Sequence, residues 1–331
     1  MGTAQKGSVK SYWPLRLLSL RSKCVGVAME WTDLKQLDNL ILGTKALGTQ
    51  IEEIGVSGEG RSLYGVTVGD KPATRTIVII AGCHADEIIG PLAAVSMIQD
   101  LVRQPLLGVK FKIVPVVDPD FLHRNAEALP VTPTLHDLLS VNQNRDLEGH
   151  FTDKTYPECV AIRQWIQRSA QIDAYFSLHS AGLISPGLFF YVGSGTETRC
   201  VGHVADCVAA ATPDYIPLLT HDPTGETQTV LSPGFLEVAI PNVEELDPEK
   251  PSNSLAFIAH HFQPQFIGVS EIPLAVCPAL SNVSLSEIDQ CNRRFSRTGH
   301  IDHAFQEISL DTQLFIIKTF IESVAQYIVT A

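Results

Sequence analysis

The chain has 331 residues, with 24 Lys and Arg against 36 Asp and Glu and a formal net charge of −12 at pH 7. Hydrophobic residues make up 45% of the chain and charged residues 18%, a composition that excludes an intrinsically disordered protein. The excess of acidic residues argues against a general nucleic-acid binder, because such a protein needs a dense basic surface.

The first 29 residues differ from the rest in charge. They contain five of the 24 basic residues and no acid, so the rest of the chain carries 19 basic and 36 acidic residues, a net charge of −17. A basic start is typical of a transit peptide or a secretion signal, but here Arg and Lys interrupt the apolar run. Met29 also precedes the first helical segment, as a true start would. We therefore expect residues 1–29 to be a dispensable extension and residues 30–331 to form one domain.

Apolar periodicity predicts alternating helices and short strands along the chain. The expected helices lie at 32–46, 88–102, 157–169, 196–211 and 254–261, with a C-terminal helix over 314–331. The expected strands lie at 50–56, 62–68, 76–82, 111–117, 174–178, 188–192 and 266–272. Runs such as Thr76–Gly82 are unbroken and apolar, which is typical of strands covered on both faces. The sequence thus predicts a single α/β domain with a mixed, mostly parallel sheet flanked by helices.

Three features set further expectations. The stretch 212–254 is rich in Pro, Thr and Glu and predicts a long loop. No run of about 18 apolar residues occurs, so we expect no membrane span. The seven cysteines are scattered and lack a C-x-x-C pair, which favours free thiols in a reducing compartment and a cytoplasmic protein.

Polar side chains follow the predicted strand 76–82. His84 and Glu87 lie three residues apart in the turn before a helix, at a strand end where ligands bind in open α/β sheets. Imidazole and carboxylate are ligands for zinc, although such a pair can also be a solvated loop with Glu87 at a helix N-terminus. His179 ends the predicted strand 174–178, so two strand ends could together supply two imidazoles and one carboxylate. The sequence therefore predicts one zinc ion held by His84, Glu87 and His179.

Asn144 and Arg145 lie between these ligands in the sequence. A guanidinium offers a two-pronged donor to a carboxylate, and an amide adds another donor. The pair predicts a site for a substrate carboxylate, although an Asn-Arg dipeptide by itself is more often a surface feature.

Together these residues resemble the zinc carboxypeptidase superfamily, over residues 50 to about 275. The segment 54–62, IGVSGEGRS, is similar to the family's G-x-S-x-x-G-R segment. His84 and Glu87 match its His-x-x-Glu ligand pair, Asn144 and Arg145 match its substrate-carboxylate pair, and His179 matches its third ligand. The resemblance implies a zinc carboxypeptidase-like catalytic domain over residues 30–331.

The resemblance also implies a catalytic Glu on a late strand and an arginine that polarises the scissile carbonyl. Glu271 best matches the first, with Glu237 as the competitor, and Arg124 best matches the second. Two positions depart from the family pattern. Asn142 stands where an Asp usually orients the first histidine. The stretch 212–254 contains only Tyr215 and gives no clear match to the family's substrate-loop tyrosine.

The function implied is zinc-dependent hydrolysis of an amide bond next to a free carboxylate, as in a metallocarboxypeptidase acting on a peptide. One alternative is an N-acyl amino-acid deacylase of the succinylglutamate desuccinylase and aspartoacylase type, because residues 82–90, GCHADEIIG, resemble that branch too. Another is a non-catalytic binding module on the same fold. The sequence does not predict the oligomeric state or the preferred side chain of the substrate.

Overall fold

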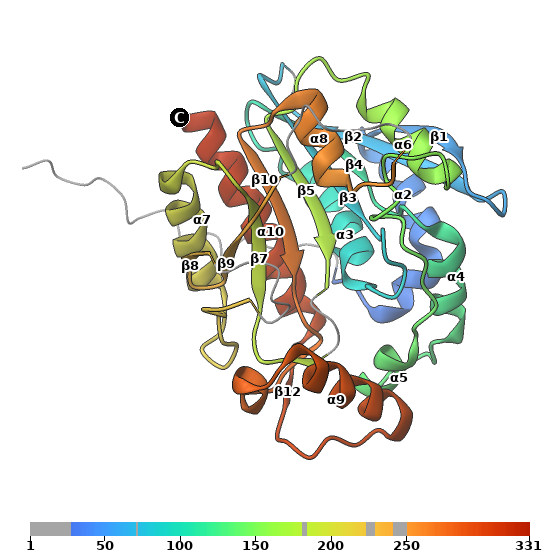
Figure 1. Cartoon of the computed structure of the whole chain (residues 1–331). Helices are drawn as coiled ribbons and strands as arrows, with labels where there is room; N and C mark the ends of the chain where they lie inside the picture. Colours follow the sequence, from blue (N-terminus) through green and yellow to red (C-terminus); the bar gives the residue numbers. More distant parts are fainter. Residues whose placement is uncertain (1–27, 71, 181–183, 223–228, 241–249) are drawn as a thin grey trace, which may run out of the picture.

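The computed structural model describes residues 28–70, 72–180, 184–222, 229–240 and 250–331 (Figure 1). Its centre is a nine-stranded mixed sheet with the strand order β1-β2-β4-β3-β5-β10-β7-β9-β8. The strands are β1 (Gln50–Val56), β2 (Ser62–Gly69), β3 (Arg75–Ala81), β4 (Val109–Val114), β5 (Ala174–His179), β7 (Phe189–Gly193), β8 (Val230–Ser232), β9 (Phe235–Val238) and β10 (Phe266–Glu271). The central strands β4, β3, β5 and β10 run parallel, and antiparallel pairs flank them on both sides.

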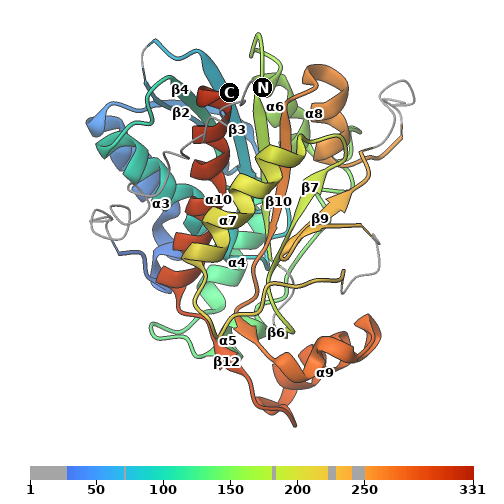
Figure 2. The ribbon, with the colours of Figure 1, turned by 90° about the vertical axis from the view of Figure 1, so that its left-hand side faces the viewer.

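Helices cover both faces of this sheet (Figure 2). One face packs against α2 (Leu37–Gly43), α3 (Ile89–Arg103), α7 (Thr198–Ala211) and α10 (Leu310–Thr330). The other face packs against α6 (Pro157–Ile166) and α8 (Ser254–Phe262). Alternate side chains of β3 enter the two cores, with Ile77 and Ile79 on the first face and Val78 and Ile80 on the second. Burial on both faces explains why this strand is continuously apolar.

The remaining helices are α4 (Pro119–Ala128), α5 (Leu135–Ser140), α9 (Leu285–Thr298) and the short 3-10 helices η1 (Trp31–Gln36), η2 (Thr44–Leu47) and η4 (Pro278–Asn282). A second sheet has the order β12-β11-β6, from β12 (Gln306–Glu307), β11 (Ala275–Val276) and β6 (Ile184–Ser185). No helix in the described ranges has both the length and the apolar character needed to cross a bilayer.

The predicted fold class is confirmed, and several of its details are corrected. The helix expected over 32–46 is divided into η1, α2 and η2. The described part of the expected loop 212–254 contains β8 and β9, which add two strands to the sheet edge. The two strands are only three and four residues long, too short for a period-two pattern to be recognised in the sequence. The expected extension 1–29 lies outside the described residues except for its last two positions, and Met29 is buried in the core.

Candidate metal centre

The turn after β3 brings His84 and Glu87 to the carboxyl end of β5. Gly82 takes a φ of +75°, a left-handed conformation that glycine adopts without strain, and so turns the chain sharply out of the strand. Gly90 lies against β5, where a Cβ atom would come within 2.6 Å of the Leu178 carbonyl oxygen. A side chain at position 90 would push α3 away, so this glycine allows the turn to approach His179.

Three side chains meet at this point. Nδ1 of His84 lies 3.1 Å from one carboxylate oxygen of Glu87, and Nδ1 of His179 lies 2.9 Å from the other. The donor atoms of the three residues all lie within 4.8 Å of one another, as the ligands of one metal ion must. The backbone N–H of Ser180 also donates to Glu87, at 3.1 Å. The structure thus brings together the three residues that the sequence predicts as metal ligands.

Charge interactions dominate the protonation of the cluster. Burial alone would lower the pKa of each histidine, but the attraction and hydrogen bonding of Glu87 raise the pKa of His84 and raise that of His179 well above its usual value. Burial alone would raise the pKa of Glu87, but the two histidines lower it. The metal-free cluster therefore holds protons between its nitrogens and a carboxylate, and a divalent cation would replace those protons.

The outer nitrogen of each imidazole has oxygen neighbours, which include one carboxylate each from residues 146–148. Nε2 of His84 lies 3.3 Å from Oδ1 of Asp146. Nε2 of His179 lies 2.8 Å from the Ser177 hydroxyl and 3.8 Å from a carboxylate oxygen of Glu148. Asn142, the residue expected to orient His84, lines a neighbouring pocket instead. The carboxylate next to Nε2 of His84 therefore comes from Asp146, which follows the Asn-Arg pair in the sequence, and not from position 142, which precedes it.

Two asparagines fix the backbone of the metal-site turn at Ala85. The Asn144 amide oxygen accepts from the Ala85 N–H at 3.3 Å, and the Asn125 amide N–H donates to the Ala85 carbonyl at 2.9 Å. Asn125 also bonds both backbone groups of Gln143, at 2.8 Å and 3.1 Å. Sequence reasoning gave Asn125 no role, because an isolated asparagine carries no signal of its burial.

The structure places Glu271 and Glu237 at different distances from the cluster. Glu271 ends β10 and pairs directly with His179 on the parallel neighbour β5. Glu237 lies on β9 opposite Val192, which in turn lies opposite Gly268 of β10. Glu237 therefore lies two strands away from β10. It is level with Gly268, three residues before the end of β10.

Arg145 lies apart from the cluster. It forms two hydrogen bonds with Asp118, at 2.8 Å and 2.9 Å, and a third with Glu158 at 2.7 Å. Asp120 also lies 3.4 Å from the guanidinium. Burial opposes the charge of Arg145, but these carboxylates outweigh it and raise the pKa of the guanidinium. The hydrogen bonds of Arg145 thus go to Asp118, Asp120 and Glu158 rather than to the three clustered residues. The role of Arg145 in substrate binding stays a prediction.

Arg124 is the more exposed of the two predicted arginines. Its guanidinium lies 4.6 Å from the ring centre of Phe121 and forms an ion pair with Glu59, in which both side chains are about 40% exposed (39% and 44%). Exposed pairs are weak, so Arg124 can exchange Glu59 for another anion at little cost.

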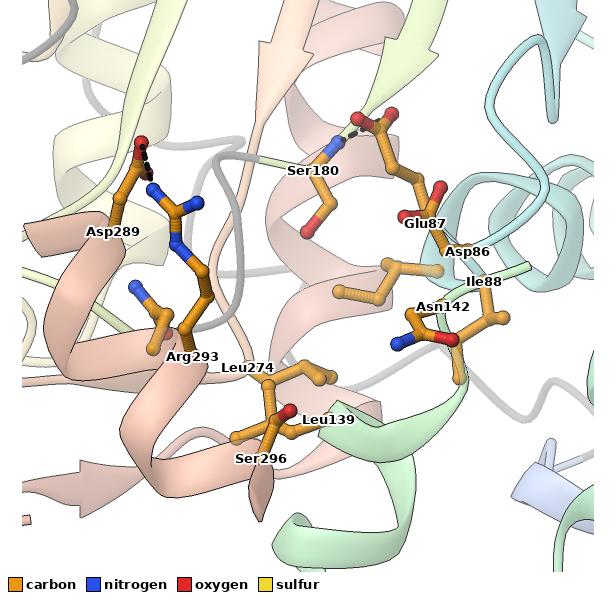
Figure 3. Close-up of a pocket in the computed structure, with 12 residues that line it drawn as sticks. Asp86, Glu87, Ile88, Leu139, Asn142, Ser180, Leu274, Asp289, Arg293 and Ser296 are labelled. Carbon is orange, nitrogen blue, oxygen red and sulfur yellow. Dashed lines mark hydrogen bonds and ion pairs between the residues drawn. The ribbon is translucent and has the colours of Figure 1, made fainter. Parts of the chain in front are cut away.

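A pocket of about 390 Å³ opens beside Glu87, between the start of α3 and helix α9 (Figure 3). Four aliphatic side chains line it: Ile88, Ile89, Leu139 and Leu274. Its charged groups are Asp86, Glu87 and the pair Asp289–Arg293. Burial, and then the negative charge of Glu87, raise the pKa of Asp86 to about 6. The pocket gives the cluster a partly apolar neighbour large enough for a substrate side chain.

The donor set fits zinc. Two imidazoles and one carboxylate are a usual ligand set of hydrolytic zinc sites, which leave one coordination position open. Both histidines present Nδ1 to the shared carboxylate, while their outer nitrogens have oxygen neighbours that would orient the rings. A mixed α/β sheet with this cluster at its carboxyl edge defines the class of protein: a fold with a site of the kind that zinc hydrolases use.

Comparison with known proteins is consistent with this class. Residues 44–127 match the family model of the zinc carboxypeptidases. Carboxypeptidase B of Astacus astacus is 28% identical over 105 residues, which cover 28% of this chain and 35% of that protein. The matched family region contains His84, Glu87 and Arg124. The resemblance to the zinc carboxypeptidase family that the motifs predict is confirmed over residues 44–127.

Solved structures show the same fold. A proposed metallopeptidase of Shewanella amazonensis superposes with a TM-score of 0.56 at 14% identity, covering 90% of this chain and 94% of that one. A metallo-carboxypeptidase of Burkholderia cenocepacia gives 0.54 at 15% identity, covering 88% and 68%. Carboxypeptidase A of Helicoverpa armigera gives 0.53 at 13% identity, covering 94% and 78%. At these identities the likeness concerns the fold alone.

Proposed function

We propose that this protein is a zinc-dependent amide hydrolase that cleaves the bond next to a free carboxylate, as a metallocarboxypeptidase that releases a C-terminal residue from a peptide. The observation that carries this proposal is the convergence of His84 and His179 on Glu87, with Glu271 directly beside His179. Relation to the zinc carboxypeptidases supports the same reaction.

The metal would be held by His84, Glu87 and His179. When bound, zinc supplies a Lewis acid and makes a water-derived nucleophile available near neutral pH. Glu271 would accept the proton of the attacking water and later deliver it to the leaving amine, as a general base and then a general acid. Its place beside His179 supports this role, because a proton carrier must lie within reach of the metal-site water.

The positive groups would act on the substrate. Arg124, released from Glu59, would donate to the oxygen that becomes negative as the amide carbonyl is attacked. Asn144 and Arg145 would hold the free carboxylate of the substrate. For Arg145 this role requires a substrate carboxylate to compete with Asp118 and Glu158 for the same guanidinium.

The decisive experiment measures metal content and hydrolysis on the same preparation. We expect about one zinc per chain and hydrolysis of peptides that end in a free carboxylate, with little hydrolysis of the same peptides capped by an amide. A matched panel of N-acyl amino acids tests the deacylase alternative. Zinc without hydrolysis of any amide would indicate a binding module, and a chain that takes up no zinc would contradict the proposal.

A further inference from the structure

The side of His179 that faces away from Glu87 is buried and carries a carboxylate. Only 6% of the His179 side chain and 13% of the Glu148 side chain is exposed. Oε2 of Glu148 lies 3.8 Å from Nε2 of His179, and the Ser177 hydroxyl lies 2.8 Å from the same nitrogen. Glu148 thus lies near Nε2 of His179, just as Asp146 lies near Nε2 of His84.

The two oxygens of Glu148 are used differently. One oxygen accepts from the backbone N–H of Ser254 at 2.8 Å and from its hydroxyl at 2.5 Å, which holds Glu148 against the start of α8. The other is buried and has no hydrogen-bond partner among the residues that the structure describes. A buried carboxylate oxygen without a partner is costly, so a donor within a short movement is expected to satisfy it. The nearest ring nitrogen is Nε2 of His179.

Metal binding would keep a donor at that nitrogen. An imidazole that binds a metal through Nδ1 must be neutral, and its proton then resides on Nε2. Nδ1 of His179 points at Glu87, so Nε2 would be the donor, and it faces Glu148 and Ser177. An acceptor at this place fixes both the tautomer and the orientation of the ring.

We infer that Glu148 is a positioning residue of the metal centre, which accepts the Nε2 proton of His179 and holds Nδ1 toward the ion. The inference rests on the proposed zinc site and adds to it a residue that no sequence motif indicated. The short segment that follows Asn144 and Arg145 then supplies a carboxylate to each imidazole: Asp146 to His84 and Glu148 to His179.

A rival interpretation makes Glu148 a metal ligand. Cys83, Glu148 and His179 also have donor atoms within 4.8 Å of one another. Cys83 is 1% exposed, whereas the side chains of His84 and Glu87 in the first group are 26% and 21% exposed. A hydrolytic zinc site needs an open position for water and substrate. The enclosed second group is therefore the poorer site for a catalytic ion.

The test is the zinc affinity of purified variants, measured by competition with a chromogenic chelator. E148Q keeps the shape of the side chain but replaces one carboxylate oxygen by an amide NH2 group. This donor must then face either Nε2 of His179 or the donors of Ser254. We expect E148Q to bind zinc about 10- to 100-fold more weakly. S254A removes one bond from the other oxygen and should bind zinc as the wild type does, and so should C83S.

Each other outcome overturns the inference. Wild-type affinity in E148Q would show that the carboxylate does not act on His179. An equal loss in S254A would show that Glu148 acts only by anchoring α8, and loss of zinc in C83S would identify the rival site. If E148Q does not fold, S177A decides: affinity within about threefold of wild type supports Glu148 as the acceptor, and a larger loss assigns that role to Ser177. Because affinity is measured without substrate, a wild type that binds zinc but cleaves no amide defeats the proposed function and leaves this test intact.

Discussion

Glu271 and His179 face each other across parallel strands β10 and β5, at the last residue of each strand. Strand register alone thus places Glu271 beside a predicted metal ligand. Ser270 strengthens this register, because its hydroxyl donates to the His179 carbonyl at 3.1 Å and accepts from the His179 N–H at 3.2 Å. Any shift of β10 along β5 would separate Glu271 from His179.

Replacing Glu271 by Gln should reduce kcat by at least about 100-fold, because the amide cannot accept a proton from water. Zinc content, measured by elemental analysis, should stay at the wild-type value. E237Q is the matched control and should retain wild-type activity, since Glu237 lies on β9 away from the cluster. Equal losses in the two variants would refute the assignment of Glu271.

Replacing His179 by Ala should lower the zinc content to well below one per chain after dialysis, because two ligands hold zinc poorly. Activity should be lost and should not return with excess zinc. His300 is the control, since it is exposed and paired with Asp302 away from the cluster, and H300A should bind zinc normally. A fully metallated H179A variant would remove His179 from the site.

Filling the pocket beside Glu87 should impair substrate binding without affecting the metal. Ser296 lines the pocket on α9, and S296W should raise KM about tenfold, equivalent to ~1.4 kcal/mol. The control S286W places the same side chain at an exposed position of the same helix and should leave KM unchanged. An unchanged KM in S296W would mean that substrate does not enter this pocket.

Replacing Arg145 by Ala should destabilise the fold by about 3–5 kcal/mol, because the buried carboxylates of Asp118 and Glu158 lose their partner. Chemical denaturation measures this loss. The exposed pair of Arg168 with Glu52 is the control, and R168A should cost about 1 kcal/mol or less. A stable R145A variant with a raised KM would indicate that Arg145 serves mainly the substrate.

Glu322 on α10 should make the stability of the protein depend on pH. Burial, opposed by the charge of Lys318, raises its pKa to about 7 from the usual 4.5. Between these two values the folded state binds more protons than the unfolded state, so stability falls as pH rises from about 4.5 through 7. E322Q cannot ionise and should gain a few degrees in Tm over the wild type at pH 8, with no gain at pH 4. Thermal melts at the two pH values check this, and an equal gain at both would contradict it.

Local sequence patterns predict the α/β fold of this protein and the three residues that cluster in it. The apolar run at 76–82 indicates a strand buried on both faces, and His84, Glu87 and His179 were recognisable because each lies at the end of such a run. Parallel strands end at the same edge of a sheet, so these positions imply proximity before any contact is known.

Interactions between distant segments decided the rest. Only the folded chain shows that Asp146, and not Asn142, lies behind His84, and that Asp118 and Glu158 surround Arg145. Strand β9 likewise depends on pairing with β7, and β8 on pairing with β9, rather than on their own apolar patterns. A sequence records which side chains could bond, but burial and reach select among them, and both are set by packing across the whole chain. The sequence by itself therefore determined the fold class and the donor set, while tertiary structure decided which carboxylates orient the donors.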